Sequence, residues 1–339
     1  MLVMGAVWKD DDIVLDVSGA TEYVIEQYDP RNYNTEEIYR GVAMPKPNTD
    51  YVTIRLSDFA KNICNSDVEG ELFNDMGYSE TLIPYYHTEL SIIYNNNSKR
   101  NAYYNSYDYN NDEDLGYVNF ISKPILPYSN RGYVLLSFYN ADGDVAYVRV
   151  IKKGTDEIYD IEITIDPFTG YIVSKGNMDV GEYEIYGDTM SNQGLVKIGE
   201  FKVVDRCNRY NLHYVNAMGG YSTLPIEGLK DKRTDSFEYN YYKTRGNNQS
   251  YTDYQMHKFQ TNITPKWELQ TGWLNDEQSG QMYHLFGSQK VWLEDIEEGK
   301  IYPVYITNNS VDYKTFTNNG KKKVSYTISV TSANTIVKH

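Results

Sequence analysis

The stretch "YVLLSFYNADGDVAYVRVIKK", residues 133–153, holds two runs of β-branched and aromatic residues on either side of a short polar segment. Such residues suit the pleated, half-buried surface of a strand. Between the runs lies Asp142-Gly143, and glycine readily adopts the positive φ that a tight turn requires. The stretch therefore predicts a β-hairpin with "NADGD" as its turn.

The "NADGD" segment also comes close to a calcium-binding string. A twelve-residue EF-hand loop needs a carboxylate at its last position, which is Ile151 here, and it needs a helix on each side. Neither requirement is met. We interpret the segment as a turn and predict no metal site.

Strand-like runs of the same kind fill the rest of the chain. In "YVTIRL" (51–56) and again in "KVSYTISVTS" (323–332), apolar and polar residues alternate with the period of a strand that has one dry and one wet face. From about residue 117 such runs recur every 8 to 12 residues, which is typical of an Ig-like or fibronectin-like sandwich. The prediction is an all-β fold of β-sandwich modules with a few short helices.

Two short helices are predicted. In 58–65 a capping Asp58 precedes apolar residues at helical spacing. In 275–286, Asn275 is the expected N-cap, Gln278 completes a capping box three residues later, and Gly287 ends the helix.

Four segments are expected along the chain. They are an N-terminal β module with one short helix (1–93), a Tyr/Asn-rich loop or arm (94–116), a central β-sandwich (117–207), and a C-terminal β module with the helix 275–286 (208–339). The arm has too few apolar residues to bury a continuous face. It is rich in rings, so we interpret it as a docking surface on another subunit, with plain mobility as the alternative. Its candidate subunit-contact residues are Tyr103, Tyr104, Tyr107 and Tyr109.

Composition bears on partners. The chain has 35 Tyr and only 10 Phe. Tyrosine is enriched where proteins meet proteins, because its ring can be buried while its hydroxyl keeps a hydrogen bond, although a β-rich composition explains the excess equally well. The net charge of -15 argues against binding to nucleic acid or to an anionic membrane.

The cellular setting is predicted from cysteines and from the start of the chain. The two cysteines, Cys64 and Cys207, are far apart and have no metal-ligand spacing. The start lacks a basic region, and no stretch approaches eighteen apolar residues. We expect a soluble protein made in a reducing cytoplasm with both thiols free.

A glycine pair in "RYNLHYVNAMGGYSTLP" (209–225) raises the question of a phosphate-binding loop. Gly219 and Gly220 follow an alternating strand, but neither GxGxxG spacing nor a following GK[ST] is present. We therefore assign a structural turn to Asn216, Gly219 and Gly220 and predict no cofactor.

No catalytic motif is found. The sequence lacks GxSxG, HExxH and SxxK, and its internal histidines are not paired at ligand spacing. These histidines are His87, His213, His257 and His284. The prediction is that the protein is not an enzyme. A glycosidase, which needs only two carboxylates in a groove, is the alternative that the sequence leaves open.

Two regions carry a resemblance to a known family. "IYRGVAMPKPNTDYVTIRLSDFAKNIC" (38–64) is similar to a strand-turn-strand-helix pattern of tail proteins from phages that infect Bacteroidetes. "LHYVNAMGGYSTLPIEG" (212–228) and "YPVYITNNSVDYKTFTNNGKKKVSYTISV" (302–330) resemble the C-terminal half of the same proteins. The matching positions are Asn216, Gly219, Gly220, Pro303, Ile306, Thr307, Ser310, Tyr313, Lys314 and Thr315.

The resemblance implies a virion structural protein of the tail or of the portal-tail collar, and the composition suits the crAss-like podoviruses. Such a protein is made in the host cytoplasm and assembles into a symmetric ring. Its partners are copies of itself and neighbouring tail, collar or portal proteins.

Two other functions stay open. One is a glycan-binding module at a tail tip or on a bacterial surface, with Trp267, Trp273 and Trp292 as stacking anchors. The other is a tail-associated depolymerase.

Overall fold

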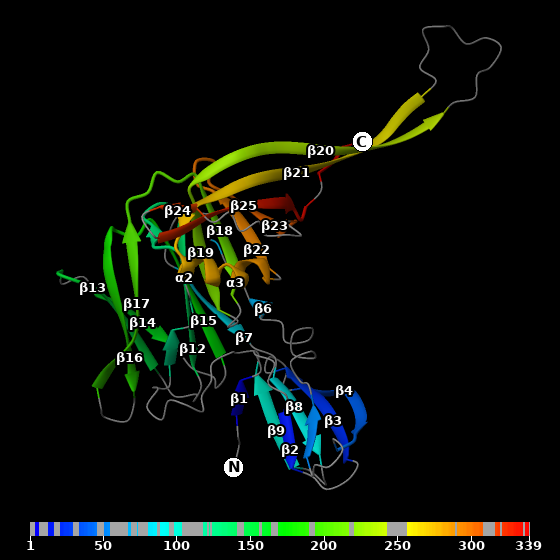
Figure 1. Cartoon of the computed structure of the whole chain (residues 1–339), viewed down its shortest axis with the longest axis vertical. Coiled ribbons are helices and arrows are strands. Elements are labelled where there is room, and N and C mark those ends of the chain that lie inside the picture. The colour runs from blue at the N-terminus through cyan, green and yellow to red at the C-terminus, as the bar shows by residue number, and fades with distance from the viewer. Residues whose placement is uncertain are drawn as a thin grey trace. The chain divides into compact units, whose positions relative to one another are not determined.

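The structure is a computed structural model of the whole chain (Figure 1). It describes residues 4–6, 13–16, 21–29, 34–45, 51–54, 67–68, 73, 81–86, 89–94, 98–103, 118–120, 122, 124–140, 146–155, 158–163, 169–189, 194–216, 220–242, 256–288, 290–307, 316–318, 321–334 and 336–338. The predicted helix 58–65 lies outside these residues.

The described residues confirm an all-β fold with short helices near the C-terminus. The chain is divided into two compact units. The first comprises residues 1–205 and 215–223, and the second comprises residues 206–214 and 224–339.

The first unit contains a five-stranded sheet in the order β1-β9-β8-β3-β4. The bounds are β1 (Met4–Ala6), β3 (Thr21–Asp29), β4 (Asn34–Ala43), β8 (Glu89–Tyr94) and β9 (Ser98–Tyr103). Strand β9 lies within the segment that was predicted to be a loop, and it pairs with β8 and β1. A small separate pair is formed by β2 (Ile13–Asp16) and β5 (Tyr51–Ile54).

The first unit also contains a β-sandwich. One layer has the order β10-β12-β15-β7-β6, and the other has the order β11-β17-β16-β13-β14. The bounds of the first layer are β6 (Asp67–Val68), β7 (Thr81–Tyr86), β10 (Val118–Phe120), β12 (Tyr133–Asn140) and β15 (Thr169–Gly176). Those of the second are β11 (Tyr128–Ser129), β13 (Ala146–Lys152), β14 (Ile158–Ile163), β16 (Gly181–Thr189) and β17 (Gly194–Val204).

The inward faces of the two layers form one apolar core. Phe138 and Val173 come from the first layer, whereas Tyr183 and Phe201 come from the second. The rings of Tyr183 and Phe201 are stacked, with centroids 4.9 Å apart. Burial of such rings is a large favourable contribution to folding, so this core holds the two layers together.

The hairpin predicted for residues 133–153 is wrong. Strand β12 pairs with β10 and β15 in one layer, whereas β13 pairs with β14 and β16 in the other. The chain therefore crosses between layers here. An alternating pattern and a Gly-containing connection are compatible with a hairpin in one layer and also with a crossing between layers. Neither feature specifies which strand pairs with which.

Pairing also crosses the boundary expected between the N-terminal and central modules. Strand β7, from the N-terminal segment, pairs with β15 over six residue pairs, from Thr169↔Tyr86 to Ser174↔Thr81. The sandwich is thus completed by residues that precede the Tyr/Asn-rich segment.

The C-terminal part is organised by a nine-stranded sheet with the path β19-β18-β22-β23-β25-β21-β20, to which β24 and β26 are added. The bounds are β18 (Tyr210–Val215), β19 (Tyr221–Ile226), β20 (Gly228–Tyr242), β21 (Met256–Leu274), β22 (Val291–Asp295), β23 (Lys300–Ile306), β24 (Phe316–Asn318), β25 (Lys321–Ser332) and β26 (Ile336–Lys338). The run "KKK" (321–323) forms the start of β25, where it pairs with β24.

The predicted C-terminal helix is present as two short helices, α2 (Asp276–Gln281) and α3 (Tyr283–Phe286). Asn275 and Gln278 form the expected capping box, in which each side chain accepts from the backbone N–H of the other residue. Gly287 follows α3 as its C-cap. Met282 and Leu285 are buried.

Candidate subunit interface

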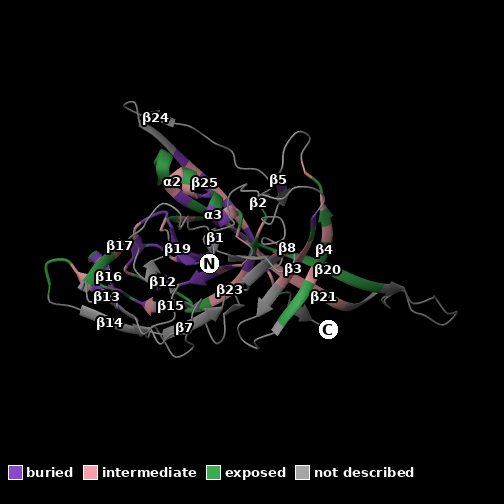
Figure 2. Cartoon of the chain, turned by 90° about the horizontal axis from the view of Figure 1, so that it is seen from below, coloured by how far each residue is buried: buried purple, intermediate pink, exposed green. Residues whose placement is uncertain are grey.

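The most exposed long strand that the structure describes is β20. It lies at the end of the nine-stranded path, and its only partner in that path is β21. Every residue from 229 to 240 is exposed, and Figure 2 shows the strand in the exposed colour. An edge strand presents a row of backbone N–H and C=O groups to any strand that can add to it.

Strands β20 and β21 run on together as a two-stranded ribbon (Figure 1). Strand β25 pairs with β21 from Lys266 to Leu274, and β26 pairs with it from Thr261 to Ile263. Beyond that point, Met256 to Gln260 pair only with β20. Among the described residues, no further strand pairs with either edge of this end of the ribbon.

Charges on one face of the ribbon lie in rows across the two strands. Asp231 is opposite Glu268, and Arg233 is opposite Lys266. Like charges directly opposite each other are unfavourable. Asp235 compensates the repulsion between Arg233 and Lys266, because its Oδ2 lies 2.5 Å from the Lys266 Nζ. This interaction lowers the pKa of Asp235.

The same face becomes aromatic further along. Phe237 and Tyr239 lie edge to face with ring centroids 5.0 Å apart, and Phe237 is 62% exposed. Across the ribbon the Gln260 side chain donates to the Asn262 Oδ1 at 2.8 Å. An exposed ring beside polar groups is typical of surfaces that bind other proteins.

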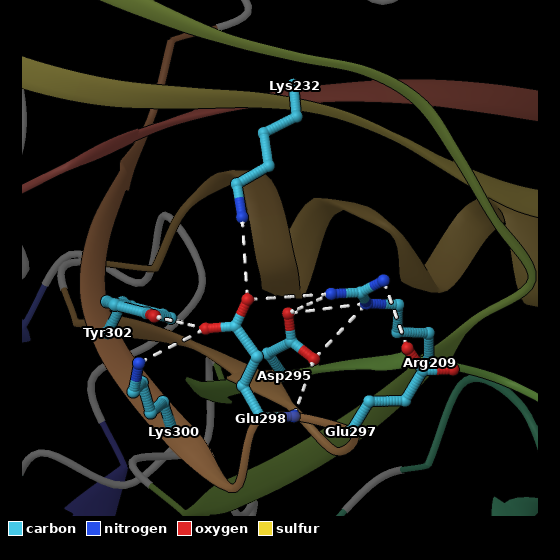
Figure 3. A network of polar contacts seen from close by, with 7 residues as sticks. All are labelled: Arg209, Lys232, Asp295, Glu297, Glu298, Lys300 and Tyr302. Atoms are coloured by element: carbon cyan, nitrogen blue, oxygen red, sulfur yellow. Dashed lines mark hydrogen bonds and ion pairs between the residues drawn. The ribbon is translucent and has the colours of Figure 1, made fainter.

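A network of charges lies at the turn between β22 and β23 (Figure 3). Arg209 donates through Nη2 to the Oδ2 of Asp295 at 2.9 Å and through Nε to both carboxylate oxygens. Its Nη1 lies 3.0 Å from the Glu297 Oε2. Asp295 also accepts from the backbone N–H of Glu298, so this buried carboxylate fixes the turn.

Lys232 links the ribbon to this network. Its Nζ lies 3.9 Å from the Glu298 Oε1 and 6.0 Å from the centre of the Trp267 ring. On the other side of Glu298, Tyr302 donates to Oε2 at 3.3 Å. The base of β20 is therefore held by the sheet, while its outer edge stays exposed.

Burial and charge shift the pKa values in the network. Burial raises the pKa of Tyr210 to about 12, and the nearby Asp295 carboxylate adds to the effect. For Asp295, burial alone would raise the pKa, but the hydrogen bonds from Arg209 and from the Glu298 N–H outweigh it and lower the pKa below 3.8. Both groups keep their ordinary charge at neutral pH.

A second polar cluster is fully buried within the sheet. The Oε2 of Glu294 accepts from the Asn211 Nδ2 at 2.8 Å and lies 3.1 Å from the His213 Nε2. Asn208 donates to the Asn211 Oδ1 at 2.7 Å. Buried polar groups need such partners, and His213 has one in Glu294.

Described residues offer little room for a small substrate beside the ribbon. A cavity of about 40 Å³ is lined by Asp231, Arg233, Lys266, Trp267, Glu268, Thr307, Ser329 and Val330. Ligand pockets usually measure roughly 300–1,000 Å³. Within the described ranges, no group of three or more His, Cys, Asp or Glu side chains is placed to hold a metal ion.

One of the four predicted contact tyrosines lies within the described residues. Tyr103 is the last residue of β9, where it pairs with Ala6 and with Glu89. Tyr104, Tyr107 and Tyr109 lie outside the described residues.

The Gly-Gly turn is placed in part. The backbone N–H of Asn216 donates to the Gly220 carbonyl at 2.7 Å, and the Gly220 N–H donates back to the Asn216 Oδ1 at 3.2 Å. The Asn216 Nδ2 also donates to the Ser222 Oγ. Asn216 thus joins β18 to β19, whereas Gly219 lies outside the described residues.

The candidate tryptophans have different surroundings. Trp267 is 3% exposed and belongs to the core, whereas Trp273 is 56% exposed. Trp292 is half-buried in β22. Cys207 is an exposed free thiol, and Cys64 lies outside the described residues.

Sequence reasoning missed the first half of β20. This half contains the charged run "KDKR" (230–233), for which the sequence gives no strand prediction. Strand β20 in fact begins at Gly228. A strand exposed on both faces has no apolar alternation, so period-2 patterning gives no signal for it.

Comparison with known proteins gives no family. No family model matches the chain, and no curated protein matches it. One solved structure with some similarity is described as "Biofilm associated protein - BSP domain"; the aligned region is 10% identical, covers 73% of this chain and 56% of that chain, and has a TM-score of 0.24. Among the described residues, no helix is both long and apolar enough to cross a membrane.

Proposed function

We propose that the protein is a structural subunit of a phage tail or portal-tail collar, which joins its neighbours in a ring by strand addition at β20. The observation that carries this proposal is the edge of β20, which is 15 residues long and exposed from residue 229 to residue 240. Proteins usually protect long edges with charged side chains, a proline, a bulge or a covering element, and β20 carries charges over residues 230–235. Strand β20 contains no proline, and its two register shifts, at Leu229/Asp231 and Tyr239/Asn240, leave the stretch between them regular.

Strand addition explains the chemistry of this edge. Main-chain hydrogen bonds give affinity, and alternate side chains give specificity. Strand β20 has both, because its open backbone is accompanied by the charged rows near Arg233 and the exposed ring of Phe237. The resemblance of the sequence to phage tail proteins is the reason for proposing a tail or collar as the assembly. The proposal includes no catalytic step.

Incorporation into particles tests the proposal. Tagged protein is supplied during phage growth, and the purified particles are examined by peptide mass spectrometry and immunogold electron microscopy. We expect label at the tail or collar. Phe237→Glu should reduce incorporation about tenfold, since a charge replaces the ring at the docking edge.

The matched control is Val180→Glu, which places the same charge at another exposed apolar residue, 50% exposed, outside the ribbon. It should be incorporated like the unaltered protein. Absence of the protein from particles, or equal incorporation of both variants, would contradict the proposal.

A glycan-binding role is a second candidate because Trp273 is exposed, as a ring that stacks on a sugar must be. Trp267 is too buried to take part. A glycan array tests this role: binding should be lost in Trp273→Ala with unchanged folding, and absence of binding by the unaltered protein would reject it.

A further inference from the structure

The β20 edge is suited to a second copy of itself. In the nine-stranded path, the strand at the other end, β19, is buried at every residue. Two copies therefore cannot extend this sheet by placing β19 of one against β20 of the next. For this sheet, the symmetric contact between identical chains is β20 against β20.

Symmetry restricts how two such strands can pair. A two-fold axis perpendicular to the sheet makes the strands antiparallel and keeps each face on its own side, so the residue on the axis faces its own copy. If the axis passes at Lys232, Arg233 or Asp235, that charged residue faces the same residue of the other copy. Like charges directly opposite each other are unfavourable.

A centre at Thr234 gives the opposite result. Arg233 then faces Asp235 of the other copy, and the reverse pair forms by symmetry. Thr234 faces itself, and paired threonines are favourable across strands. Asp231 faces Phe237, which places the exposed ring diagonal to the Arg233 guanidinium, within reach of a cation–π contact.

The charges within one chain favour this arrangement. Arg233 lies opposite Lys266 in the ribbon, and Asp235 forms an ion pair with Lys266. Among the described residues, Arg233 forms no ion pair, although its charge helps to lower the pKa of Asp235 on the same strand. A second copy would bring a carboxylate to it on the open side of the strand.

We infer that in the free protein two copies pair their β20 strands antiparallel, in a register centred on Thr234, and so close the edge until a neighbour in the particle replaces the second copy. This inference rests on the proposed role of β20 in docking. The dimer should be weak and dependent on concentration, since one strand seam buries less than the roughly 1,200 Å² of the smaller stable interfaces.

Cysteine cross-linking tests the register. In a Cys64→Ser, Cys207→Ser background, Thr234→Cys should form a disulfide-linked dimer, because directly opposed Cα atoms lie about 4.5–5.5 Å apart, within disulfide range. The control is Ser236→Cys, whose thiol would face Lys232 and should cross-link at least about tenfold less. Equal cross-linking of both variants would overturn the register.

Charge reversal tests the pairing independently. By sedimentation, Arg233→Asp should raise the dimer dissociation constant at least about tenfold, and Arg233→Asp with Asp235→Arg should restore it, because the swapped charges again face each other. Circular dichroism confirms that each variant is folded. No loss in the single variant, or no recovery in the double variant, would overturn the inference.

The two proposals fail in different ways. A protein that stays monomeric but enters particles through Phe237 would refute the dimer and leave the tail role standing. A protein that forms the Thr234-centred dimer but is absent from particles would refute the tail role alone.

Discussion

At the scale of single residues, Glu294 shows how a buried charge is accommodated. Its carboxylate is 1% exposed and lies within hydrogen-bonding distance of Asn211 and His213. Glu294→Ala should lower the free energy of unfolding by about 2–4 kcal/mol, since it removes a buried carboxylate that accepts a hydrogen bond from Asn211 and lies beside His213. Urea denaturation measures this change.

The control for this prediction is Glu36→Ala, which removes an acid from an exposed position in β4 and should change stability by about 0.5 kcal/mol or less. Equal effects of the two substitutions would show that the buried cluster adds no stability.

Asp295 gives a prediction for pH. Hydrogen bonds from Arg209 and from the Glu298 N–H outweigh the effect of burial and lower the pKa of this carboxyl in the folded protein. A lowered folded-state pKa means that the stabilisation is present above the unfolded pKa, near 3.9, and is lost as the pH falls through the folded value. Between pH 5 and pH 3, stability should therefore decrease less steeply in Asp295→Asn than in the unaltered protein.

Denaturation series at several pH values provide this comparison. Asp235→Asn is the reference, because its carboxyl is also paired, with Lys266, but lies exposed in the ribbon where solvent screens the interaction. Parallel stability curves for the unaltered protein and Asp295→Asn would refute the assigned role of Arg209.

At the scale of elements, the irregularity in β21 depends on one glycine. Gly272 has φ +75°, in the left-handed region, and lies where the pairing with β25 shifts between Gln270 and Trp273. A Cβ there would lie 2.7 Å from the Cδ of Glu227. Gly272→Ala should cost about 1–3 kcal/mol, because the conformation is strained for alanine and Glu227 must move.

Gly228→Ala is the matched control, since a Cβ added at Gly228 meets no atom within 4 Å. Thermal denaturation should show a clear decrease for Gly272→Ala and almost none for Gly228→Ala. The reverse order would mean that the shift in β21 does not depend on this backbone conformation.

At the scale of the whole molecule, the division into two units predicts more than one unfolding step. Calorimetry should resolve separate transitions. Phe201→Ala removes a ring from the sandwich core of the first unit, and Leu293→Ala removes a fully buried side chain from the second. Each should shift a different transition, because each loses local packing, about 3–5 kcal/mol for Phe201→Ala and about 2–5 kcal/mol for Leu293→Ala.

Merged transitions that both variants shift together would show that the chain unfolds as one cooperative body.

The fold class and the local signals could be predicted from the sequence. Alternation in 323–332 gave β25, and Asn275 with Gln278 gave the start of α2. The structural turn at Asn216 was also predicted, and Asn216 exchanges hydrogen bonds with Gly220. These features depend on residues near one another in the chain, so a pattern of a few positions is enough to specify them.

The pairing of strands was decided only by the tertiary structure. Residues 133–153 have the pattern of a hairpin, yet β12 and β13 lie in different layers, and the exposed edge at Arg233 gave no strand signal at all. A period of two specifies which residues share a face, but not which strand lies alongside, because that choice depends on burial shared between distant segments. The sequence by itself therefore determined the elements, and the packing of the sheets determined which edge stayed open.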